Sequence, residues 1–286
     1  MSLVRIEFSR PESDCDACQA YLSLAVPHGW EETRGPDGAV FFRFFLDGHP
    51  LWREIAAEIE KRWPGCGCSC TEEEACDWSA SWREFFVPIE CGDRFEVLPP
   101  WLAGDGRADL TPILIEPKMA FGTGHHPSTA LCLAAIASLH RRGLIRPGQE
   151  FLDLGTGSGI LGIALCKLGL SGIGLDTDPQ AVACARENVA LNDATGMRLA
   201  VGSLASLKSG RPLDVIVANI LSGPLVGMAR EMTARLAPGG CLVLSGILAE
   251  QADAVERAYA EAGLPGAARL SEGEWVALVW PASGAA

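Results

Sequence analysis

The chain has 286 residues, of which 48% are hydrophobic, and a formal net charge of −13. That length and apolar content suit a well-folded globular protein with room for two domains, and no run of 18 apolar residues predicts a membrane span. Residues 1–100 carry 19 acidic and 9 basic side chains, which argues against nucleic acid as a partner of that half. A basic protein is a better partner, although acids that only keep the surface soluble explain the charge equally well.

The first 62 residues alternate strand-like and helix-like segments in the order β-α-β-β-α. Strand patterns cover Val4 to Phe8 and Val40 to Leu46, and helix patterns cover Asp14 to Ala25 and Pro50 to Arg62. This order predicts a small α/β sandwich of the ferredoxin-like type over residues 1–62. Because the N-terminus has a strand pattern instead of a signal peptide, we expect a cytoplasmic protein.

A stretch with a high density of Gly and Pro follows and is interpreted as a linker region over residues 63–112. The cysteines nearby, Cys15-x-x-Cys18 and Cys66-x-Cys68-x-Cys70, lack the paired knuckles of a zinc site, so free thiols are favoured over a metal. Four other cysteines fall in apolar patterns and are expected to be buried thiols: Cys132, Cys166, Cys184 and Cys241.

Helices and short apolar strands alternate from Ile113 to the C-terminus, so residues 113–286 form the second predicted domain. The helix patterns cover Leu131 to His140, Ile160 to Leu168, Pro179 to Leu191, Leu225 to Leu236 and Glu250 to Ala262. The strand patterns cover Glu150 to Asp153, Gly172 to Asp176, Val215 to Asn219, Cys241 to Ser245 and Trp275 to Trp280. This alternation predicts a doubly wound, mostly parallel sheet with helices on both faces, and the last two strands are expected to close its edge.

A glycine-rich turn joins the first of these strands to its helix. Gly155, Gly157 and Gly159 alternate with other residues there, so a ligand can touch the backbone of the turn. Asp176 ends the next strand, 21 residues after Gly155, which is the spacing at which a carboxylate accepts both ribose hydroxyls of a nucleoside cofactor. The segment therefore predicts a nucleoside site.

The turn differs from a dinucleotide fingerprint in two ways. Ile160 stands where the third glycine of G-x-G-x-x-G would be, and Asp153 stands two residues before the first glycine. A carboxylate near a helix N-terminus would repel a pyrophosphate, whereas the sulfonium and ammonium groups of S-adenosylmethionine gain from it. The pattern D-x-G-x-G-x-G resembles the first motif of class I S-adenosylmethionine-dependent methyltransferases, so Asp153, Gly155 and Gly157 are expected cofactor contacts.

A strand that ends at Asn219 places an amide at the ligand crevice, because carboxyl ends of strands face that crevice in open α/β sheets. The amide oxygen can hold an N–H of an incoming amine, and the backbone carbonyl of Ile220 or Leu221 can take a second one. Asn219 and Leu221 are thus the expected catalytic positions. The alternative is that Asn219 only caps the turn before Gly223-Pro224.

The segment Pro117 to Thr129 contains paired glycines, two histidines and two hydroxyl residues at the start of a helix. We expect this loop, with Phe121, to wrap the cofactor. Adjacent histidines point apart and chelate metals poorly, so His126 is expected to give an orienting hydrogen bond, with a helix cap from Ser128 or Thr129.

Four motifs in order, M-A-F-G-T-G-x-H-P-[ST]-T, D-x-G-x-G-S-G-I-L, A-N-I-L and the late L-S-G-I-L, resemble the ribosomal protein L11 methyltransferase (PrmA) family. The resemblance implies a seven-stranded Rossmann-like methyltransferase domain that uses S-adenosylmethionine. It also implies methylation of lysine side chains and the N-terminal amine of ribosomal protein L11, which the small N-terminal domain recruits. The family's cofactor contacts fall on Thr129, Gly155, Asp176 and Asn219.

The expected reaction is in-line attack of a neutral amine on the sulfonium methyl, with no metal and no assured general base. His125 and His126 are candidate bases, and bulk water is the alternative acceptor of the proton. Two other functions stay open: a related protein-lysine methyltransferase with another substrate, and a non-catalytic ribosome-associated module that binds the cofactor. The chain is expected to act as a monomer without membrane contact.

Overall fold

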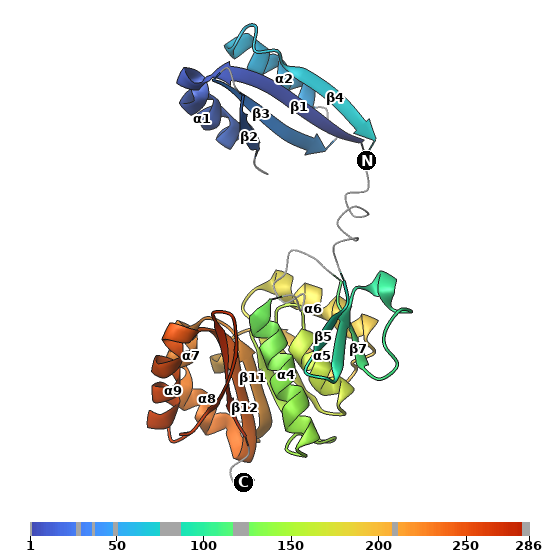
Figure 1. Cartoon of the computed structure of the whole chain (residues 1–286), viewed down its shortest axis with the longest axis vertical. Coiled ribbons are helices and arrows are strands. Elements are labelled where there is room, and N and C mark those ends of the chain that lie inside the picture. The colour runs from blue at the N-terminus through green and yellow to red at the C-terminus, as the bar shows by residue number, and fades with distance from the viewer. Residues whose placement is uncertain are drawn as a thin grey trace. The chain divides into compact units, whose positions relative to one another are not determined.

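The computed structural model describes residues 2–26, 30–35, 38–47, 51–74, 87–116, 126–207 and 211–281. The chain divides into two compact units, Met1–Phe85 and Phe86–Ala286, each with its own core (Figure 1). Among the described residues, no helix has the length and apolar character needed to cross a bilayer.

The N-terminal unit is one antiparallel sheet with strand order β2-β3-β1-β4 and two helices. Its elements are β1 (Ser2–Pro11), η1 (Glu12–Asp14), α1 (Cys15–Ala25), β2 (Glu31–Arg34), β3 (Ala39–Asp47), α2 (Leu51–Arg62) and β4 (Ser69–Glu74). Alternate residues of β1, such as Ile6 and Phe8, are buried and pack with Leu22 of α1 and Ile59 of α2. This β-α-β-β-α-β order matches the predicted ferredoxin-like sandwich and adds one strand to it.

The structure divides the chain differently from the predicted boundaries at residues 62 and 113. Within the supposed linker of residues 63–112, β4 pairs with β1 and so belongs to the N-terminal sheet. The C-terminal unit begins with its own small sheet of β5 (Ile89–Cys91), β6 (Phe95–Leu98) and β7 (Thr111–Leu114), with η2 (Pro100–Leu102) between the last two. The strands β5, β6 and β7 have only three or four residues each, and β4 ends in consecutive glutamates. None of the four therefore shows the apolar alternation that predicts a strand.

The C-terminal unit is built on a sheet of seven strands in the order β10-β9-β8-β11-β12-β14-β13. The strands are β8 (Glu150–Leu154), β9 (Ser171–Asp176), β10 (Met197–Val201), β11 (Leu213–Asn219), β12 (Leu236–Leu248), β13 (Ala268–Glu272) and β14 (Trp275–Trp280). Neighbours from β10 to β12 run parallel, and β14 is antiparallel to both β12 and β13. This confirms the predicted doubly wound, mostly parallel sheet.

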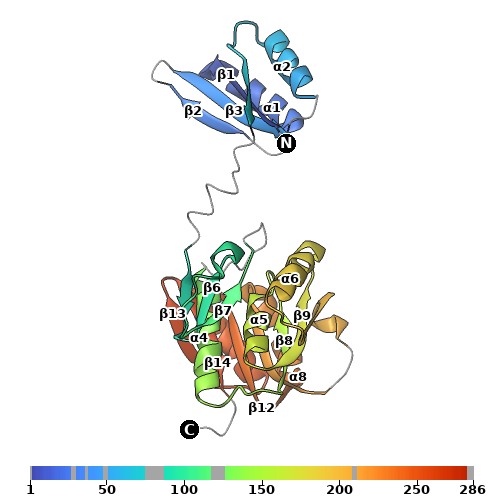
Figure 2. The same cartoon turned by 90° about the vertical axis from the view of Figure 1, so that its right-hand side faces the viewer.

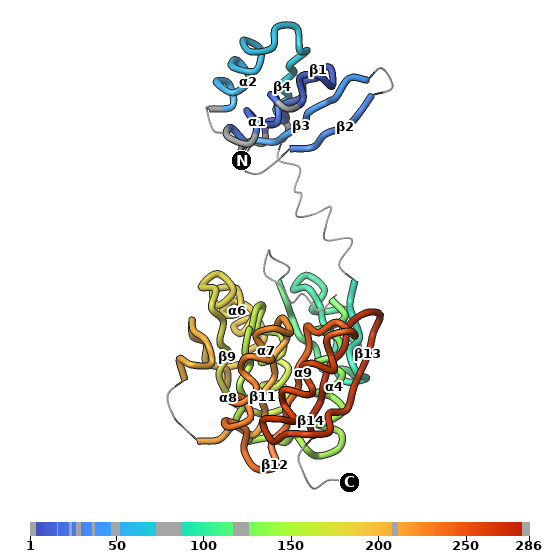
Figure 3. Tube along the Cα trace, turned by 90° about the vertical axis from the view of Figure 1, so that its left-hand side faces the viewer, coloured from blue at the N-terminus to red at the C-terminus, as the bar shows by residue number. Residues whose placement is uncertain are grey.

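Helices cover both faces of this sheet, as predicted. They are α4 (Pro127–Arg141), α5 (Ile160–Lys167), α6 (Pro179–Leu191), α7 (Ser222–Gly227), α8 (Ala229–Arg235) and α9 (Ala252–Glu261), with η3 (Leu204–Ser206) and η4 (Ala249–Gln251). Val215 and Val217 of β11 enter the core with α4 and α5, whereas Ile216 and Ala218 enter the core with α7, α8 and α9. The small sheet of β6 and β7 lies beside α4 and α5 (Figure 2), and α7 and α9 lie side by side on the opposite face (Figure 3).

Three details differ from the sequence prediction. The helix expected over Leu225 to Leu236 is two short helices, because the backbone at Met228 (φ −97°, ψ 3°) leaves helical geometry between them. The strands β10 and β13 were not predicted. The edge of the sheet is therefore β13 instead of β14, and the largely exposed, polar sequence of β13 shows no apolar face.

Candidate functional site

A cavity of about 470 Å³ opens beside the carboxyl ends of β8, β9 and β11. The strand order reverses between β8 and β11, and open α/β sheets bind ligands at that switch point. The residues that line the cavity are Leu154, Gly155, Gly157, Asp176, Thr177, Gly202, Ser203, Leu204, Asn219, Ile220, Leu221, Pro224 and Met228. Five predicted site residues are thus brought together here from strands far apart in the sequence: Gly155, Gly157, Asp176, Asn219 and Leu221.

The glycine-rich turn forms one wall and uses backbone conformations that favour glycine. Gly155, Gly157 and Gly159 have φ values of 72°, 54° and 85°. A Cβ added to Gly155 would lie 2.3 Å from Cγ2 of Ile220, so only glycine lets the turn approach β11 this closely. The amides of Gly155 and Thr156 donate to the carbonyl of Leu175 at 2.8 and 2.9 Å, which ties the turn to β9.

Asp176 stands at the end of β9 with its carboxylate held by two backbone amides. Gly157 N donates to Oδ2 at 2.9 Å, and Asp178 N donates to Oδ1 at 3.0 Å. An ionised carboxylate has about four acceptor positions, so both oxygens keep capacity for further donors. The side chain is therefore preorientated in the cavity wall as an acceptor for a pair of hydroxyls, which fits the ribose of a nucleoside.

Asp153 lies beneath the turn and is not among the described residues that line the cavity. Its Oδ2 accepts hydrogen bonds from Thr156 Oγ1 at 2.7 Å and from Gly162 N at 3.0 Å. Burial raises the pKa of this carboxyl to about 6, against the effect of those two hydrogen bonds. Asp153 thus supports the turn and the start of α5 from below, and a direct contact between Asp153 and the cofactor stays a prediction.

Asn219 ends β11 with its amide group in a fixed orientation. Its Nδ2 donates to Oγ1 of Thr129 at 3.1 Å, and Thr129 is fully buried on α4. Its Oδ1 is buried and has no hydrogen-bond partner among the described residues. An unpaired buried carbonyl oxygen is costly, so this atom suits a ligand that brings an N–H donor. Thr129, expected as a cofactor contact, reaches the site through Asn219.

The chain after Asn219 crosses the cavity mouth before α7 begins. Ile220 N donates to the carbonyl of Ser245 at 3.2 Å, and a Cβ on Gly246 would lie 2.5 Å from the carbonyl oxygen of Ile220. Gly246 (φ 79°) therefore allows β12 to support this crossing, which explains the glycine of the L-S-G-I-L motif. Leu221 follows at the mouth with 73% of its surface exposed.

The histidine-containing loop is described only from His126 onward, so the predictions for Phe121 and His125 concern residues outside the described part of the chain. His126 itself is the N-cap of α4, because its Nδ1 accepts from Ser128 N at 3.3 Å. The helix cap thus comes from His126 and not, as was predicted, from Ser128 or Thr129, whereas an orienting hydrogen bond given by His126 stays a prediction. The ring also packs edge-on against Trp275 of β14, with centroids 4.5 Å apart.

The side of the cavity that follows β10 was not predicted from the sequence, because β10 itself was not predicted. Gly202, Ser203 and Leu204 follow that strand, and Gly202 N donates to the carbonyl of Asp176 at 2.8 Å. The sequence signal for this side of the cavity was the pair Gly202-Ser203 directly after the short strand β10. On the opposite side, Pro224 and Met228 add apolar wall from α7 and its end.

Cysteine chemistry stays outside this cavity. All described cysteines are free thiols; Cys132, Cys184 and Cys241 are buried as predicted, and Cys166 is half-buried. Burial raises the pKa of the Cys132 thiol to about 12. Within the described ranges, no three His, Cys, Asp or Glu side chains are grouped to hold a metal ion.

This strand order, with a glycine-rich turn after β8 and an acid at the end of β9, defines the Rossmann-like fold of S-adenosylmethionine-dependent methyltransferases. Within that class, the chain belongs to the ribosomal protein L11 methyltransferase (PrmA) family, whose model matches residues 41–282. The crystal structure of the ribosomal protein L11 methylase from Lactobacillus delbrueckii subsp. bulgaricus is similar, with a TM-score of 0.61 and 31% identity over 68% of this chain and 97% of that chain.

Two curated relatives, both ribosomal protein L11 methyltransferases, extend the comparison. The protein of Geobacter metallireducens is 42% identical over 207 residues, which are 72% of this chain and 66% of the relative. That of Pseudomonas aeruginosa is 45% identical over 184 residues, which are 64% of this chain and 60% of the relative. The chain therefore matches less than two-thirds of the length of either relative.

Proposed function

We propose that this protein transfers methyl groups from S-adenosylmethionine to lysine side chains and to the N-terminal amine of ribosomal protein L11. The observation that carries the proposal is the buried, unpaired Oδ1 of Asn219 beside a cavity that also presents the carboxylate of Asp176. The Oδ1 of Asn219 suits an incoming amine, and the carboxylate of Asp176 suits a ribose. We take ribosomal protein L11 as the substrate because the two relatives are ribosomal protein L11 methyltransferases.

The residues of the cavity fit the cofactor by their chemistry. Asp176 would accept the ribose hydroxyls, and the backbone of Gly155 and Gly157 would face the amino-acid part. When bound, S-adenosylmethionine supplies an electrophilic methyl group on a sulfonium. Asp153 places a carboxyl under the turn, and the positive charge of a bound cofactor would favour the ionised form of that carboxyl.

The protein's part in the reaction is to orient the amine. The Nδ2 group of Asn219 donates one N–H to Thr129, which orients the amide so that its oxygen is the acceptor without a partner among the described residues. That oxygen accepts one N–H of the amine, and the backbone carbonyl at Leu221 takes a second, which leaves the lone pair free to attack. Such positioning can contribute up to ~7–11 kcal/mol when the reacting atoms are held close and aligned.

A lysine amine must lose its proton before attack, since its reference pKa is about 10.4. Of the described residues in the cavity wall, only Asp176 can titrate, and both of its oxygens already accept backbone amides. Nδ1 of His126 accepts from Ser128. We therefore propose that water takes the proton before the amine enters, since the described residues of the cavity wall provide no free base; His125 lies outside the described residues.

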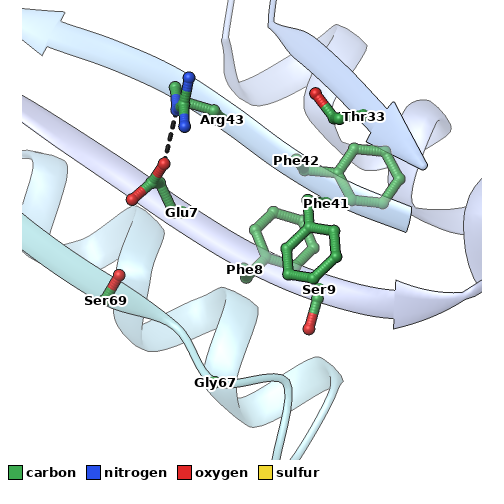
Figure 4. Close-up of a pocket in the computed structure, with 9 residues that line it drawn as sticks. All are labelled: Glu7, Phe8, Ser9, Thr33, Phe41, Phe42, Arg43, Gly67 and Ser69. Atoms are coloured by element: carbon green, nitrogen blue, oxygen red, sulfur yellow. Dashed lines mark hydrogen bonds and ion pairs between the residues drawn. The ribbon is translucent and has the colours of Figure 1, made fainter. Parts of the chain in front are cut away.

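We assign substrate recruitment to the N-terminal unit. The sheet face opposite its helices carries a hollow of about 340 Å³ beside Phe41, whose side chain is 48% exposed (Figure 4). Ser9 and Thr33, the cross-strand neighbours of Phe41, are small and leave the ring open, and Arg43 pairs with Glu7 at the rim. An exposed aromatic ring with a polar rim on an acidic unit suits a basic protein substrate.

The test is transfer of labelled methyl groups from S-adenosylmethionine to purified L11, with other basic ribosomal proteins as competitors. Selective labelling of L11 is the expected result. Labelling of another protein in its place would point to the related lysine methyltransferase, and absence of transfer to any of them would favour a non-catalytic cofactor-binding module. The assay uses the full chain, which we expect to act in the cytoplasm.

A further inference from the structure

Two buried asparagines lie four residues apart at the end of α6, outside the cavity wall: Asn188 in its last turn and Asn192 just after it. Asn188 has no exposed surface, and Asn192 is 3% exposed. Buried amide groups are costly unless each donor and acceptor is paired. Their partners therefore show what the two side chains hold together.

Asn188 bonds to two separate segments of the chain. Its Nδ2 donates to the carbonyl of Ser158 at 2.8 Å, and its Oδ1 accepts from Glu116 N at 3.0 Å. Ser158 lies in the glycine-rich turn between Gly157 and Gly159, and Glu116 lies just beyond the end of β7. One side chain thus joins the turn of the cofactor cavity to the chain that leaves β7.

Asn192 bonds to β7 but not to the turn. Its Oδ1 accepts from Leu114 N at 2.9 Å, and its Nδ2 donates to the carbonyls of Leu114 at 2.6 Å and Asn188 at 2.8 Å. The two asparagines are therefore both buried at the C-terminal end of α6, and both bond to the backbone at or just beyond the end of β7. Only Asn188 also bonds to Ser158 in the glycine-rich turn.

The bond to Ser158 needs an amide at position 188. A single planar group must donate to one carbonyl and accept from one N–H in opposite directions, and among short side chains only asparagine does so. The carbonyl of Ser158 lies one residue after Gly157, whose backbone amide holds Asp176, so this buried bond fixes the turn next to the contact with Asp176. The geometry at the turn thus depends on a helix that has no contact of its own with the ligand cavity among the described residues.

We propose that Asn188 is a positioning residue for the cofactor: it sets the glycine-rich turn in its binding geometry and joins that turn to the backbone at Glu116, just beyond β7. The inference rests on the proposed function, since it takes the cavity beside the turn as the cofactor site.

The test compares Asn188→Ala with Asn192→Ala in the full chain. Both changes remove buried hydrogen bonds to the backbone at or just beyond the end of β7, so both should lower the thermal midpoint by similar amounts. Only Asn188→Ala removes the bond to Ser158 in the turn, and its dissociation constant for S-adenosylmethionine, measured by calorimetry, should rise by about tenfold. The constant of Asn192→Ala should stay within about threefold of the wild-type value.

A second variant keeps the test decisive if Asn188→Ala fails to fold. Asn188→Asp conserves the size of the side chain and the acceptor for Glu116 N, but places an acceptor against the carbonyl of Ser158. It should weaken cofactor binding at least as much as the alanine change. Wild-type affinity in either position-188 variant, or an equal loss in Asn192→Ala, would overturn the inference alone. A wild-type chain that binds no S-adenosylmethionine would overturn the proposed function and this inference together.

Discussion

Replacement of Asp176 by alanine removes the acceptor that we assign to the ribose. The carboxylate lies at the end of β9 in the cavity wall and is held by the amides of Gly157 and Asp178. Because these amides preorientate it, the carboxylate needs little ordering when a diol arrives. The loss on mutation should therefore appear almost entirely in cofactor affinity.

The size of that loss follows from the charge of the acceptor. Hydrogen bonds to ionised groups contribute about 1.5–3 kcal/mol, which corresponds to a rise of roughly 10- to 150-fold in the dissociation constant for S-adenosylmethionine. Release of Gly157 N from its partner adds to this, since that amide belongs to the turn. We expect a value in the upper half of the range for Asp176→Ala.

Calorimetry on the folded variant measures the effect, and Asp178→Ala is the matched control. Asp178 is two residues away and caps α6 by accepting from Gln180 N at 2.8 Å, yet it does not line the cavity. Its loss should lower stability by about 1 kcal/mol and leave cofactor affinity near the wild-type value. Unchanged affinity in Asp176→Ala, or equal losses in both variants, would refute the assignment of Asp176 to the ribose.

Three other predictions test the turn and the division of labour. Gly155→Ala should abolish cofactor binding and destabilise the fold, since the added Cβ would lie 2.3 Å from Ile220. Gly143→Ala is the control, because Gly143 has a similar φ of 70° but open space around it, so this change adds only backbone strain. Equal effects of the two changes would contradict the close contact at Gly155. The pKa of Asp153 is raised from 3.8 to about 6 in the folded chain, so its contribution favours folding at low pH and falls by about 3 kcal/mol as pH rises from about 4 to about 6. Asp153→Asn should flatten that part of the stability curve measured by denaturant unfolding, and an unaltered slope would contradict the raised pKa. Deletion of residues 1–85 should leave S-adenosylmethionine affinity nearly intact and abolish methylation of folded L11, and full activity of the truncated chain would refute recruitment by the N-terminal unit.

Local patterns predicted the parts of the fold that have strong local signals. The helix over Pro179 to Leu191 has the predicted bounds, because Asp178 caps it and proline starts it. The turn at Gly155 and the acid at Asp176 were readable from spacing alone. In contrast, β4, β10 and β13 are short or polar and owe their conformation to pairing with neighbouring strands, which no local pattern reveals.

Tertiary contacts likewise decided the roles that the sequence left open. Asp153 and Thr129 were recognised as site residues, but only the fold shows that one supports the turn and the other orients Asn219. Asn188 carried no functional signal in the sequence, since its two partners lie 30 and 72 residues away. Such long-range hydrogen bonds are invisible to periodicity.

The most direct test of the account is peptide mass spectrometry of ribosomal protein L11 after incubation with the full chain and S-adenosylmethionine, beside a parallel reaction with Asn219→Ala. The account predicts added methyl groups on lysine side chains and on the N-terminal amine with the wild-type chain, and a loss of at least about 100-fold in rate with the variant, because the amine loses its orienting acceptor. Unmodified L11 with a wild-type chain that binds the cofactor, or equal rates for the two chains, would contradict it.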